Sequence, residues 1–262
     1  MLKNFLSLAF KYIVHSLSAK SKKGHGIHSP FVFDLCTHVF SKKTKEIKEI
    51  EKCRKKLLSS VEKISFHDIG AGSSVDNKKI RKIKEIARYS SNKKINKLMF
   101  KLVSHLKPTT IIEFGTSFAF STMYMAKANS KTKIISIEGI PEIASVAKRN
   151  MSELDIKNVQ IIESSFDNYL ENVPSKIQGK TLVFLDGNHK KEATLKYFFY
   201  VIKHIPEDSV IVIYDINWSA GMNEAWEEIK KSEQFELSID LFFVGLVFKR
   251  VGIYKQNFKI RF

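Results

Sequence analysis

The chain has 262 residues, of which 44% are hydrophobic and 27% charged, as expected for a globular protein with a full core. No apolar stretch reaches the 18 residues of a membrane span. The chain has two cysteines without CxxC spacing, which favours free thiols over a disulfide framework and predicts a cytoplasmic location. The net charge of +17 lies entirely in residues 1–110, where 25 basic and 8 acidic side chains give 25 − 8 = +17, whereas residues 111–262 carry 19 of each. The basic part allows contact with nucleic acid or an anionic surface, but a set of solvated lysine-rich helices is the simpler interpretation.

The first predicted element is an amphipathic helix. Its apolar residues at helical spacing are Leu2, Phe5, Leu6, Ala9, Ile13 and Leu17. Lys11 and His15 interrupt the apolar run, and no small-residue cleavage site follows, so a signal peptide is not indicated. We expect this helix to pack on the domain rather than lie on a membrane.

Helical patterns continue up to Pro108. A Gly/His/Ser turn leads to a helix that Pro30 can open, and lysine-rich helices are predicted over 42–58, 78–90 and 92–106. Only one short strand, KISF, is expected in this region. We therefore predict a basic helical cap over 1–107 and a second domain over 108–262.

After Pro108, short apolar runs alternate with helical stretches. The runs are TTIIEF, TKIISIEG, VQIIES, TLVFLDG and SVIVIYD. Such a pattern is typical of a parallel sheet covered by helices on both faces. Two further runs around Gly245 predict a closing antiparallel hairpin with its turn at that glycine. The fold class is thus α/β, a Rossmann-like, doubly wound seven-stranded sheet with an antiparallel C-terminal hairpin and an N-terminal helical extension.

Two glycine-containing loops compete for the role of a nucleotide site. A nucleotide loop of an α/β fold needs a strand before it, a helix after it and an acid near the end of the next strand. The first loop, FHDIGAGSS, is followed by a basic stretch in which no second strand is predicted, and Glu85 there falls inside a helix. We expect Asp68, Gly70 and Gly72 to shape a turn between the cap and the second domain instead.

The second loop, IIEFGTSFAFST, has the complete context. Small residues follow Glu113 at alternate positions, namely Gly115, Ser117 and Ala119, and a helical stretch begins directly afterwards. The next strand ends in Glu138, at the place where an acid accepts hydrogen bonds from ribose hydroxyls. The loop lacks the G-x-G-x-x-G pattern of a dinucleotide site.

An acid followed by small residues at a spacing of two resembles the first motif of class I S-adenosyl-L-methionine (SAM)-dependent methyltransferases. GTS and ST in the same loop resemble the catechol O-methyltransferase-like branch, and VFLDGNH resembles the DG-x-H motif of bacterial small-molecule methyltransferases. This superfamily resemblance covers about residues 108–252. GHGIHSPFVFDL, GAGSS, LDGNH, WSAGMNEAW and VGLVF together resemble a Bacteroidetes group of class I methyltransferases over nearly the whole chain. One departure is Ala119, where the family usually has glycine.

The resemblance implies SAM as the cofactor. The cofactor contacts that it implies are Glu113, Gly115, Thr116, Ser117 and Ser121 in the loop, Glu138 and Gly139 at the ribose, Ser165 and Phe166 at the adenine, and Asp186 after the fourth strand. Two alternatives stay open, because Ser164 or Ser165 is also a suitable helix cap and Glu138 could be a solvated strand end.

Methyl transfer to a hydroxyl requires an aligned acceptor and removal of a proton. His189 is the candidate base, since the pKa of histidine is near neutral, and Asp186 and Asp215 complete the predicted catalytic set. A structural or solvated role for His189 is equally open. Asn188 and Trp218 are predicted substrate contacts, with a core aromatic as the alternative for Trp218.

No obligatory metal is predicted. Metal-dependent O-methyltransferases place an acid–amide pair after the fifth strand, where this chain has Tyr214, Asp215 and Ile216, an incomplete set of oxygen ligands. His25 and His28 lie three residues apart, but the neighbouring Gly26 and Pro30 indicate a loop. We expect these histidines to contact the acceptor or shape the loop rather than bind a metal.

The function predicted from these features is SAM-dependent methyl transfer to a small-molecule acceptor, at a hydroxyl oxygen, by a protein compatible with a homodimer. The alternative is an RNA methyltransferase or nucleic-acid-binding protein that uses the basic N-terminal part. DGNHKK stands where base amino-methylating enzymes carry a Pro-Pro-aromatic motif, and no cysteine lies nearby. The lysine-rich helices also lack interleaved aromatic residues. The small-molecule function is therefore favoured.

Overall fold

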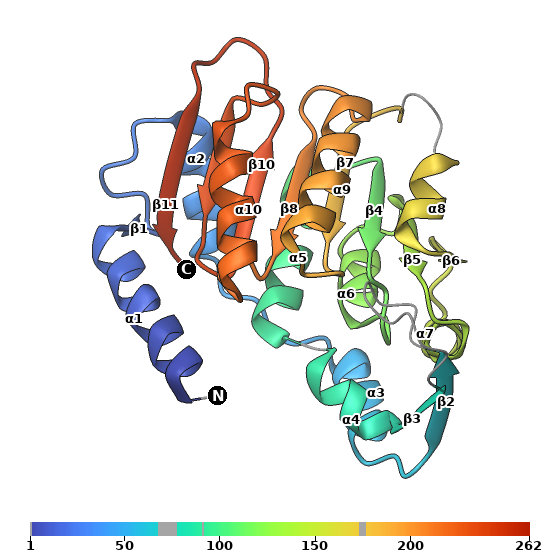
Figure 1. Cartoon of the computed structure of the whole chain (residues 1–262). Coiled ribbons are helices and arrows are strands. Elements are labelled where there is room, and N and C mark those ends of the chain that lie inside the picture. The colour runs from blue at the N-terminus through green and yellow to red at the C-terminus, as the bar shows by residue number, and fades with distance from the viewer. Residues whose placement is uncertain (1, 68–77, 91, 173–176) are drawn as a thin grey trace. The chain divides into compact units, whose positions relative to one another are not determined.

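The computed structural model describes residues 2–67, 78–90, 92–172 and 177–262. Two compact α/β units are present (Figure 1). Unit 1 is formed by Met1–Lys42 with Ser175–Phe262, and unit 2 by Lys43–Pro174. The division into a cap over 1–107 and a catalytic domain over 108–262 stays a prediction.

Unit 2 is built around three parallel strands. They are β4 (Thr110–Phe114), β5 (Lys133–Glu138) and β6 (Val159–Glu163), with β5 paired to β4 on one side and to β6 on the other. The helices of unit 2 are α3 (Lys48–Leu58), α4 (Ile83–Tyr89), α5 (Lys93–Leu106), α6 (Phe120–Ala128), α7 (Pro141–Glu153) and α8 (Phe166–Glu171). The alternation of strand and helix after Pro108 confirms the predicted parallel arrangement in this unit.

A second, antiparallel pair of strands corrects the prediction for the basic N-terminal region. β2 (Lys63–His67) pairs with β3 (Lys78–Lys82), and helix α4 begins only at Ile83. The predicted helix over 78–90 is therefore confirmed only for Ile83–Tyr89, and the predicted lack of a strand after GAGSS is wrong. Pairing with β2 overrides the helical propensity of the lysines, a non-local effect that the local pattern does not contain. The GAGSS loop, with Asp68, Gly70 and Gly72, lies outside the described residues.

The N-terminal helices of unit 2 share one core with the loop that follows β4. Apolar side chains of α3 and α4, including Ile50 and Ile83, cluster with Phe118 of that loop and with Met123 of α6. The hydroxyl of Tyr124 on α6 also donates to Glu51 of α3 at 3.2 Å. The lysine-rich helices thus support the loop from below, whereas their charged faces remain in solvent.

Within its described residues, unit 1 contains six strands in the order β1-β11-β9-β10-β8-β7. These strands are β1 (Lys20–Ser21), β7 (Thr181–Leu185), β8 (Val210–Tyr214), β9 (Leu237–Asp240), β10 (Val244–Phe248) and β11 (Gln256–Arg261). β7 and β8 are parallel, whereas β10 runs antiparallel to both β8 and β9. The helices are α1 (Leu2–Ser18), α2 (Pro30–Leu35) with a π-helical continuation η1 (Cys36–Phe40), α9 (Lys191–His204) and α10 (Ala220–Lys231). The predicted α/β class, mostly parallel sheet and antiparallel C-terminal hairpin are confirmed.

Two details of unit 1 differ from the prediction. β1 and β11 extend the sheet beyond β9, so the prediction of seven strands left out these two. The hairpin turns between Asp240 and Val244, and Gly245 lies inside β10. A Cβ atom at Gly245 would lie 2.6 Å from the ring of Trp226, so this glycine makes room for the indole rather than for a turn.

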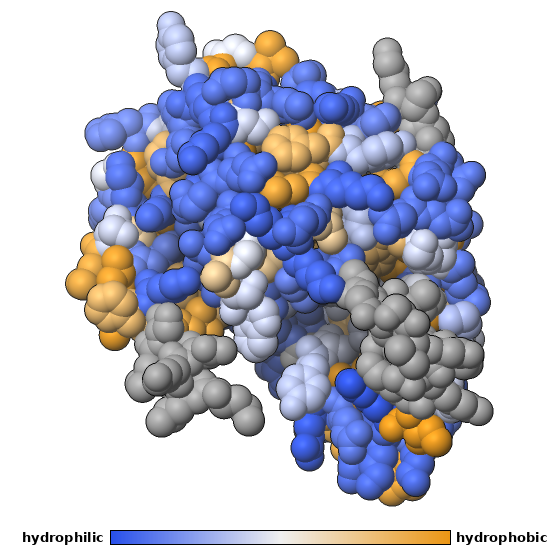
Figure 2. All heavy atoms as spheres, in the orientation of Figure 1, coloured by the Kyte–Doolittle hydropathy of each residue, from blue (hydrophilic) through white to orange (hydrophobic). Residues whose placement is uncertain are grey.

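Helix α1 packs on unit 1, but not through the expected stripe. His15 and Ala19 are buried, whereas Ala9, Ile13 and Leu17 are exposed. Figure 2 shows an apolar patch over α1 at the left edge of the view. The prediction of packing by the Ile13 stripe is therefore wrong for its described members. Among the described residues, no helix is long and apolar enough to cross a membrane. Cys36 and Cys53 are buried free thiols, as predicted.

Candidate functional site

The loop between β4 and α6 has left-handed backbone at every second residue. Gly115, Ser117 and Ala119 have φ angles of 107°, 46° and 67°. A positive φ favours glycine, because a Cβ atom then crowds the following carbonyl, and Ser117 and Ala119 adopt it although they carry a Cβ. The backbone of the loop thus turns in the same way at each of the three small residues. The amides of Gly115 and Thr116 both donate to the carbonyl of Ile137 on β5, at 3.0 and 3.2 Å.

Glu113, at the end of β4, is fully buried beneath the loop. Its carboxylate accepts hydrogen bonds from the hydroxyls of Ser121 and Ser136, each at 2.6 Å, and from Thr122 at 2.5 Å. Ser136 also lies 2.6 Å from the hydroxyl of Thr116. Burial raises the pKa of Glu113 to about 7, although the three hydroxyls favour its charged form. This network connects the loop, the start of α6 and strand β5 through one carboxylate.

Glu138, at the end of β5, holds the other side of the loop. Its Oε2 accepts the amide of Ser117 at 2.8 Å, and its Oε1 accepts the amide of Ile140 at 3.1 Å. The side chain is half-buried, and burial raises its pKa above the ordinary glutamate value, against the opposing effect of the amides. The amide of Gly139 also bonds this carboxylate, which has about four acceptor positions, so it retains capacity for a ribose hydroxyl. The residues therefore fit the nucleoside part of SAM.

The segment after β6 supplies an apolar edge. Phe166 is half-buried and lies edge-on to Phe114, with ring centroids 5.4 Å apart. Ser165 caps helix α8, since its hydroxyl accepts the amide of Asn168 at 3.2 Å. The cap that remained an alternative for Ser165 is thus present, while contact of Ser165 or Phe166 with an adenine stays a prediction.

In unit 1, a polar cluster follows the parallel strands β7 and β8. His189 is half-buried, and its Nε2 lies 3.9 Å from Oδ1 of Asp186. Burial lowers the pKa of His189, so the imidazole is neutral and able to accept a proton at neutral pH. The carboxyl ends of adjacent parallel strands place these groups at the edge where open sheets bind ligands.

Tyr214 and Asp215 complete this cluster from the end of β8. The ring of Tyr214 lies 6.4 Å from that of His189, centroid to centroid, in an edge arrangement. Burial raises the pKa of Asp215 to about 6, partly offset by a hydrogen bond with Tyr214. Asp215 also has a φ of 57°, and its carbonyl accepts the amide of Trp218 at 2.9 Å. The cluster thus holds an imidazole whose pKa burial lowers and a carboxyl whose pKa burial raises.

The remaining predicted contacts lie around this cluster or on the surface of unit 1. Asn188 has a φ of 50°, and its amide donates to the hydroxyl of Tyr197 at 3.2 Å. Trp218 is 65% exposed, so the alternative of a core aromatic is wrong. His25 and His28 are exposed in a loop, as their neighbours Gly26 and Pro30 indicated. Within the described part of the chain, no group of three His, Cys, Asp or Glu side chains is placed to hold a metal.

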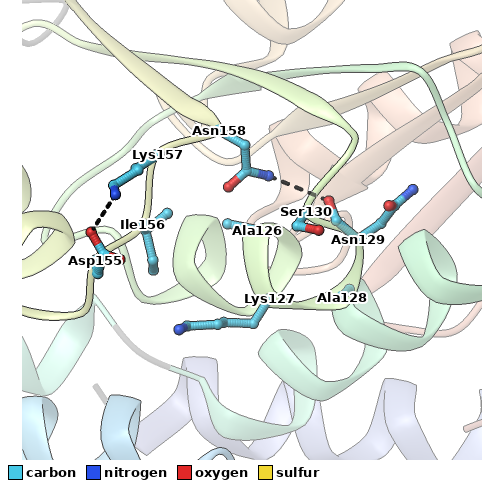
Figure 3. Close-up of a pocket in the computed structure, with 9 residues that line it drawn as sticks. All are labelled: Ala126, Lys127, Ala128, Asn129, Ser130, Asp155, Ile156, Lys157 and Asn158. Carbon is cyan, nitrogen blue, oxygen red and sulfur yellow. Dashed lines mark hydrogen bonds and ion pairs between the residues drawn. The ribbon is translucent and has the colours of Figure 1, made fainter.

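An open groove of about 680 Å³ lies at the other end of the unit 2 strands (Figure 3). It is lined by the end of α6 and the connection into β6, where Lys157 pairs with Asp155 at 3.2 Å. Asn158 crosses it to donate to the carbonyl of Asn129 at 3.3 Å. The groove is at the amino ends of β5 and β6, away from the loop after β4, and is not the candidate cofactor site.

Ser136, Thr122 and Tyr214 are site residues that the sequence reading missed. Ser136 interrupts the apolar strand KIISIE, and it lies directly opposite Glu113 in the β4–β5 register. A polar residue in a buried strand needs a partner, so this position carried a usable signal. Thr122 belongs to the ST pair of the loop motif and Tyr214 precedes the predicted Asp215, but neither was assigned a role of its own.

Comparison with known proteins identifies the class. Residues 112–216 match the family model described as a methyltransferase domain. This segment runs from β4 to the end of β8 and so includes Glu113, Glu138, His189 and Asp215. This stretch of the chain is therefore similar to a methyltransferase domain, in agreement with the predicted class I, SAM-dependent type.

Three relatives illustrate the similarity. Catechol O-methyltransferase of Mycobacterium tuberculosis is 24% identical over 141 residues, which are 53% of this chain and 62% of that protein, so the chain spans less than two thirds of this relative. The methyltransferase PaMTH1 of Podospora anserina, bound to S-adenosylhomocysteine (SAH), has a TM-score of 0.61 at 11% identity, over 86% of this chain and 97% of that one. The SAM-bound O-methyltransferase TomG of Streptomyces achromogenes has a TM-score of 0.56 at 14% identity, over 80% and 93% of the two chains. The predicted Rossmann-like methyltransferase fold is thereby confirmed.

Proposed function

We propose that this protein transfers the methyl group of SAM to a hydroxyl oxygen of a small molecule. The observation that carries the proposal is the neutral, half-buried imidazole of His189 after β7, with the carboxylates of Asp186 and Asp215 on the same sheet edge. An alcohol or phenol must lose its proton as its oxygen is methylated, and a base that is neutral at physiological pH meets this need. The similarity to a catechol O-methyltransferase supports oxygen as the acceptor atom.

The donor side of the reaction belongs to unit 2. When bound, SAM supplies an electrophilic methyl group, and the protein has only to hold and orient it. Glu138 would bind the ribose, Gly115 would allow close approach of the backbone, and Phe166 would cover the adenine. Thr116 and Ser117 of the same loop, and Gly139 directly after β5, would be further contacts of the cofactor. Glu113 and Ser121 are bonded to each other beneath the loop, so they would act by fixing its shape.

The acceptor side belongs to unit 1. His189 would take the proton of the acceptor hydroxyl at Nε2 or Nδ1, and Asp186 would stabilise the imidazolium that forms. Asp215, Asn188 and the exposed indole of Trp218 would contact the acceptor. Exposed His25 and His28 remain candidate acceptor contacts from the N-terminal loop of the same unit.

Turnover of a His189→Gln variant tests this proposal. Release of S-adenosylhomocysteine is measured with a panel of catechols, phenols and aliphatic alcohols, and turnover should fall about 100- to 10,000-fold with the best acceptor. The acid limb of the wild-type rate should lie below pH 6.5, because burial lowers the pKa of His189, and the variant should lose this limb. His204→Gln, a half-buried histidine on α9 that bonds to Tyr200, is the matched control. Unchanged turnover in the His189 variant would remove this residue as the base.

A nucleic-acid acceptor is the second candidate, favoured by the basic surface of β2 and β3. Lys63 lies directly opposite Lys82, and both side chains and the neighbouring Arg81 are exposed, so like charges gather on this ribbon and would attract an anion. If RNA is the acceptor, a gel shift should weaken steeply with salt and should disappear in an Arg81→Glu, Lys82→Glu variant. No shift at low salt would eliminate this candidate.

A further inference from the structure

In the described side chains of helix α1, residues 8–18, one face is covered and the opposite face is exposed. On the covered face, His15 is buried, and Tyr12 meets Phe242 edge-on with ring centroids 5.0 Å apart. The opposite face consists of Phe10, Ile13, Val14 and Leu17, which are 66%, 55%, 48% and 81% exposed. These four residues follow the i, i+3, i+4, i+7 spacing of one helical face, and we call them the outer stripe. Large apolar side chains that gather on one exposed face mark an interaction surface.

The orientation of α1 is fixed by a buried hydrogen-bond network. Nε2 of His15 lies 3.0 Å from Oδ1 of Asp240 at the end of β9. Asp240 also accepts the indole N–H of Trp226 at 3.3 Å and the amide of Phe242 at 2.8 Å. A rotation of α1 that buried the outer stripe would break the His15 bond and leave a buried carboxylate with fewer donors, which is costly. The outer stripe therefore needs an occupant from outside unit 1.

The charge around the helix indicates what that occupant is. Residues 1–28 contain five lysines and no Asp or Glu, and Lys20, Lys22 and Lys23 are exposed directly after α1. A second copy of the chain is disfavoured, because a twofold interface places the same patch against itself and would bring both sets of lysines together. A partner with an apolar interior and a negatively charged surface would bury the outer stripe and also neutralise the lysines.

We propose that α1 binds in the plane of an anionic lipid surface. The outer stripe would enter the boundary between head groups and acyl chains, and the lysines after the helix would meet the acidic head groups. The apolar patch over α1 in Figure 2 is the surface concerned. The helix would thus anchor to unit 1 through His15 and to lipid through Leu17 and Ile13. This inference concerns the place where the protein works and does not depend on the proposed methyl acceptor.

Sedimentation of the full chain with lipid vesicles tests the proposal. Vesicles of phosphatidylcholine alone and of phosphatidylcholine with phosphatidylserine are compared, and binding is expected to the anionic vesicles. Raising the salt to about 1 M should weaken binding, because the Debye length shrinks to about 3 Å. An Ile13→Ser, Leu17→Ser variant should bind at least about tenfold more weakly, since the apolar part of the interaction is lost.

Two further variants separate the contributions. Lys22→Glu, Lys23→Glu keeps the outer stripe intact and should reduce binding to anionic vesicles only. Val61→Ser, Tyr254→Ser removes two apolar side chains that are 83% and 92% exposed elsewhere, and should bind as the wild type does. Circular dichroism checks that each variant is folded, which is expected because all the changed side chains are exposed.

The proposal is overturned if the wild type sediments with neither type of vesicle at low salt. Equal loss in the Val61, Tyr254 variant would also overturn it, since the effect would then be general surface hydrophobicity. Light scattering measures the oligomeric state of the wild type and of the Ile13→Ser, Leu17→Ser variant. If the wild type is a dimer that does not bind vesicles, and the variant is a monomer, the outer stripe binds a second copy of the chain and the proposal is overturned.

Discussion

The loop after β4 in unit 2 and the polar cluster after β7 and β8 in unit 1 differ in the distances between their polar side chains. In the loop, Glu113 accepts three hydroxyls, and Glu138 accepts the amides of Ser117 and Ile140. In the cluster, 3.9 Å separates His189 from Asp186, which is too far for a hydrogen bond between these atoms. The first arrangement suits a site that holds a ligand in one geometry, and the second suits groups that must exchange a proton.

The same contrast appears in what burial does to the titrating groups. Burial raises the pKa of Glu113 to about 7 and that of Asp215 to about 6. Glu113 is fully enclosed, so its proton cannot reach an acceptor molecule and its charge state affects the fold. Asp215 and His189 are half-buried, so their protons can reach a ligand. Similar upward shifts in the pKa of Glu113 and Asp215 thus have different consequences, because only Asp215 is accessible to a ligand. Variants of the two regions should therefore affect cofactor binding, stability and turnover separately.

The largest effect expected from the loop is on cofactor affinity. Glu138→Gln should weaken SAH binding about 10- to 100-fold, because an amide offers only one acceptor atom and cannot replace charge-assisted bonds. Glu163→Gln is the matched control, since Glu163 occupies the neighbouring register position at the exposed end of β6. Calorimetry measures both affinities, and wild-type affinity for the Glu138 variant would contradict the assignment of the ribose site. Turnover at saturating SAM should fall less than in the His189 variant.

The second effect is on the pH dependence of stability. The pKa of Glu113 in the folded state, about 7, lies above the ordinary value of 4.5, so its neutral form is the one that folding favours. The stability it contributes is fully present below pH 4.5 and is lost as the pH rises through 7. Glu113→Gln cannot ionise and should lack this loss.

Urea unfolding at several pH values measures the difference between the two proteins. Relative to wild type, the Glu113→Gln variant should gain on the order of 3 kcal/mol in free energy of unfolding between about pH 4 and pH 8. The comparison uses only the change with pH, so a constant cost of the substitution does not affect it. Parallel pH profiles for the two proteins would show that Glu113 does not titrate as the buried geometry implies.

The loop after β4 was predictable from the sequence. Most of the strands and side chains that pack around it and around the rest of the sheet were not. Gly115, Ser117 and Ala119 reveal the loop because they form a local pattern of small residues between a strand and a helix. The β2–β3 pair, strand β11 and the exact hairpin turn depend on partners far away in the chain. Gly245 is the clearest case, since its role depends on the ring of Trp226, which no local pattern indicates. For the same reason, the exposed face of α1 could not be distinguished from its buried face before Asp240 was known to bind His15.

The smallest effect expected concerns the link between Glu113 and the loop. Ser136→Ala removes one donor from Glu113 and the partner of Thr116, and should cost about 1–3 kcal/mol of stability. Because that hydroxyl lowers the pKa of Glu113, its loss should move the pH-dependent part of the stability to higher pH. Ser238→Ala on β9 removes a comparable buried hydroxyl, bonded to Asn257, and is the control in unit 1.

The two serine variants separate a local role from a general one. Both should lose stability, but only Ser136→Ala should weaken SAH binding, by about two- to fivefold, because only Ser136 connects the carboxylate under the loop to Thr116 within it. Calorimetry at a temperature where both variants are fully folded makes this comparison. Equal affinities in the two variants would mean that the hydroxyl network stabilises unit 2 without shaping the loop. The firmness of the loop would then come from its backbone bonds to Ile137 and from Glu138 alone.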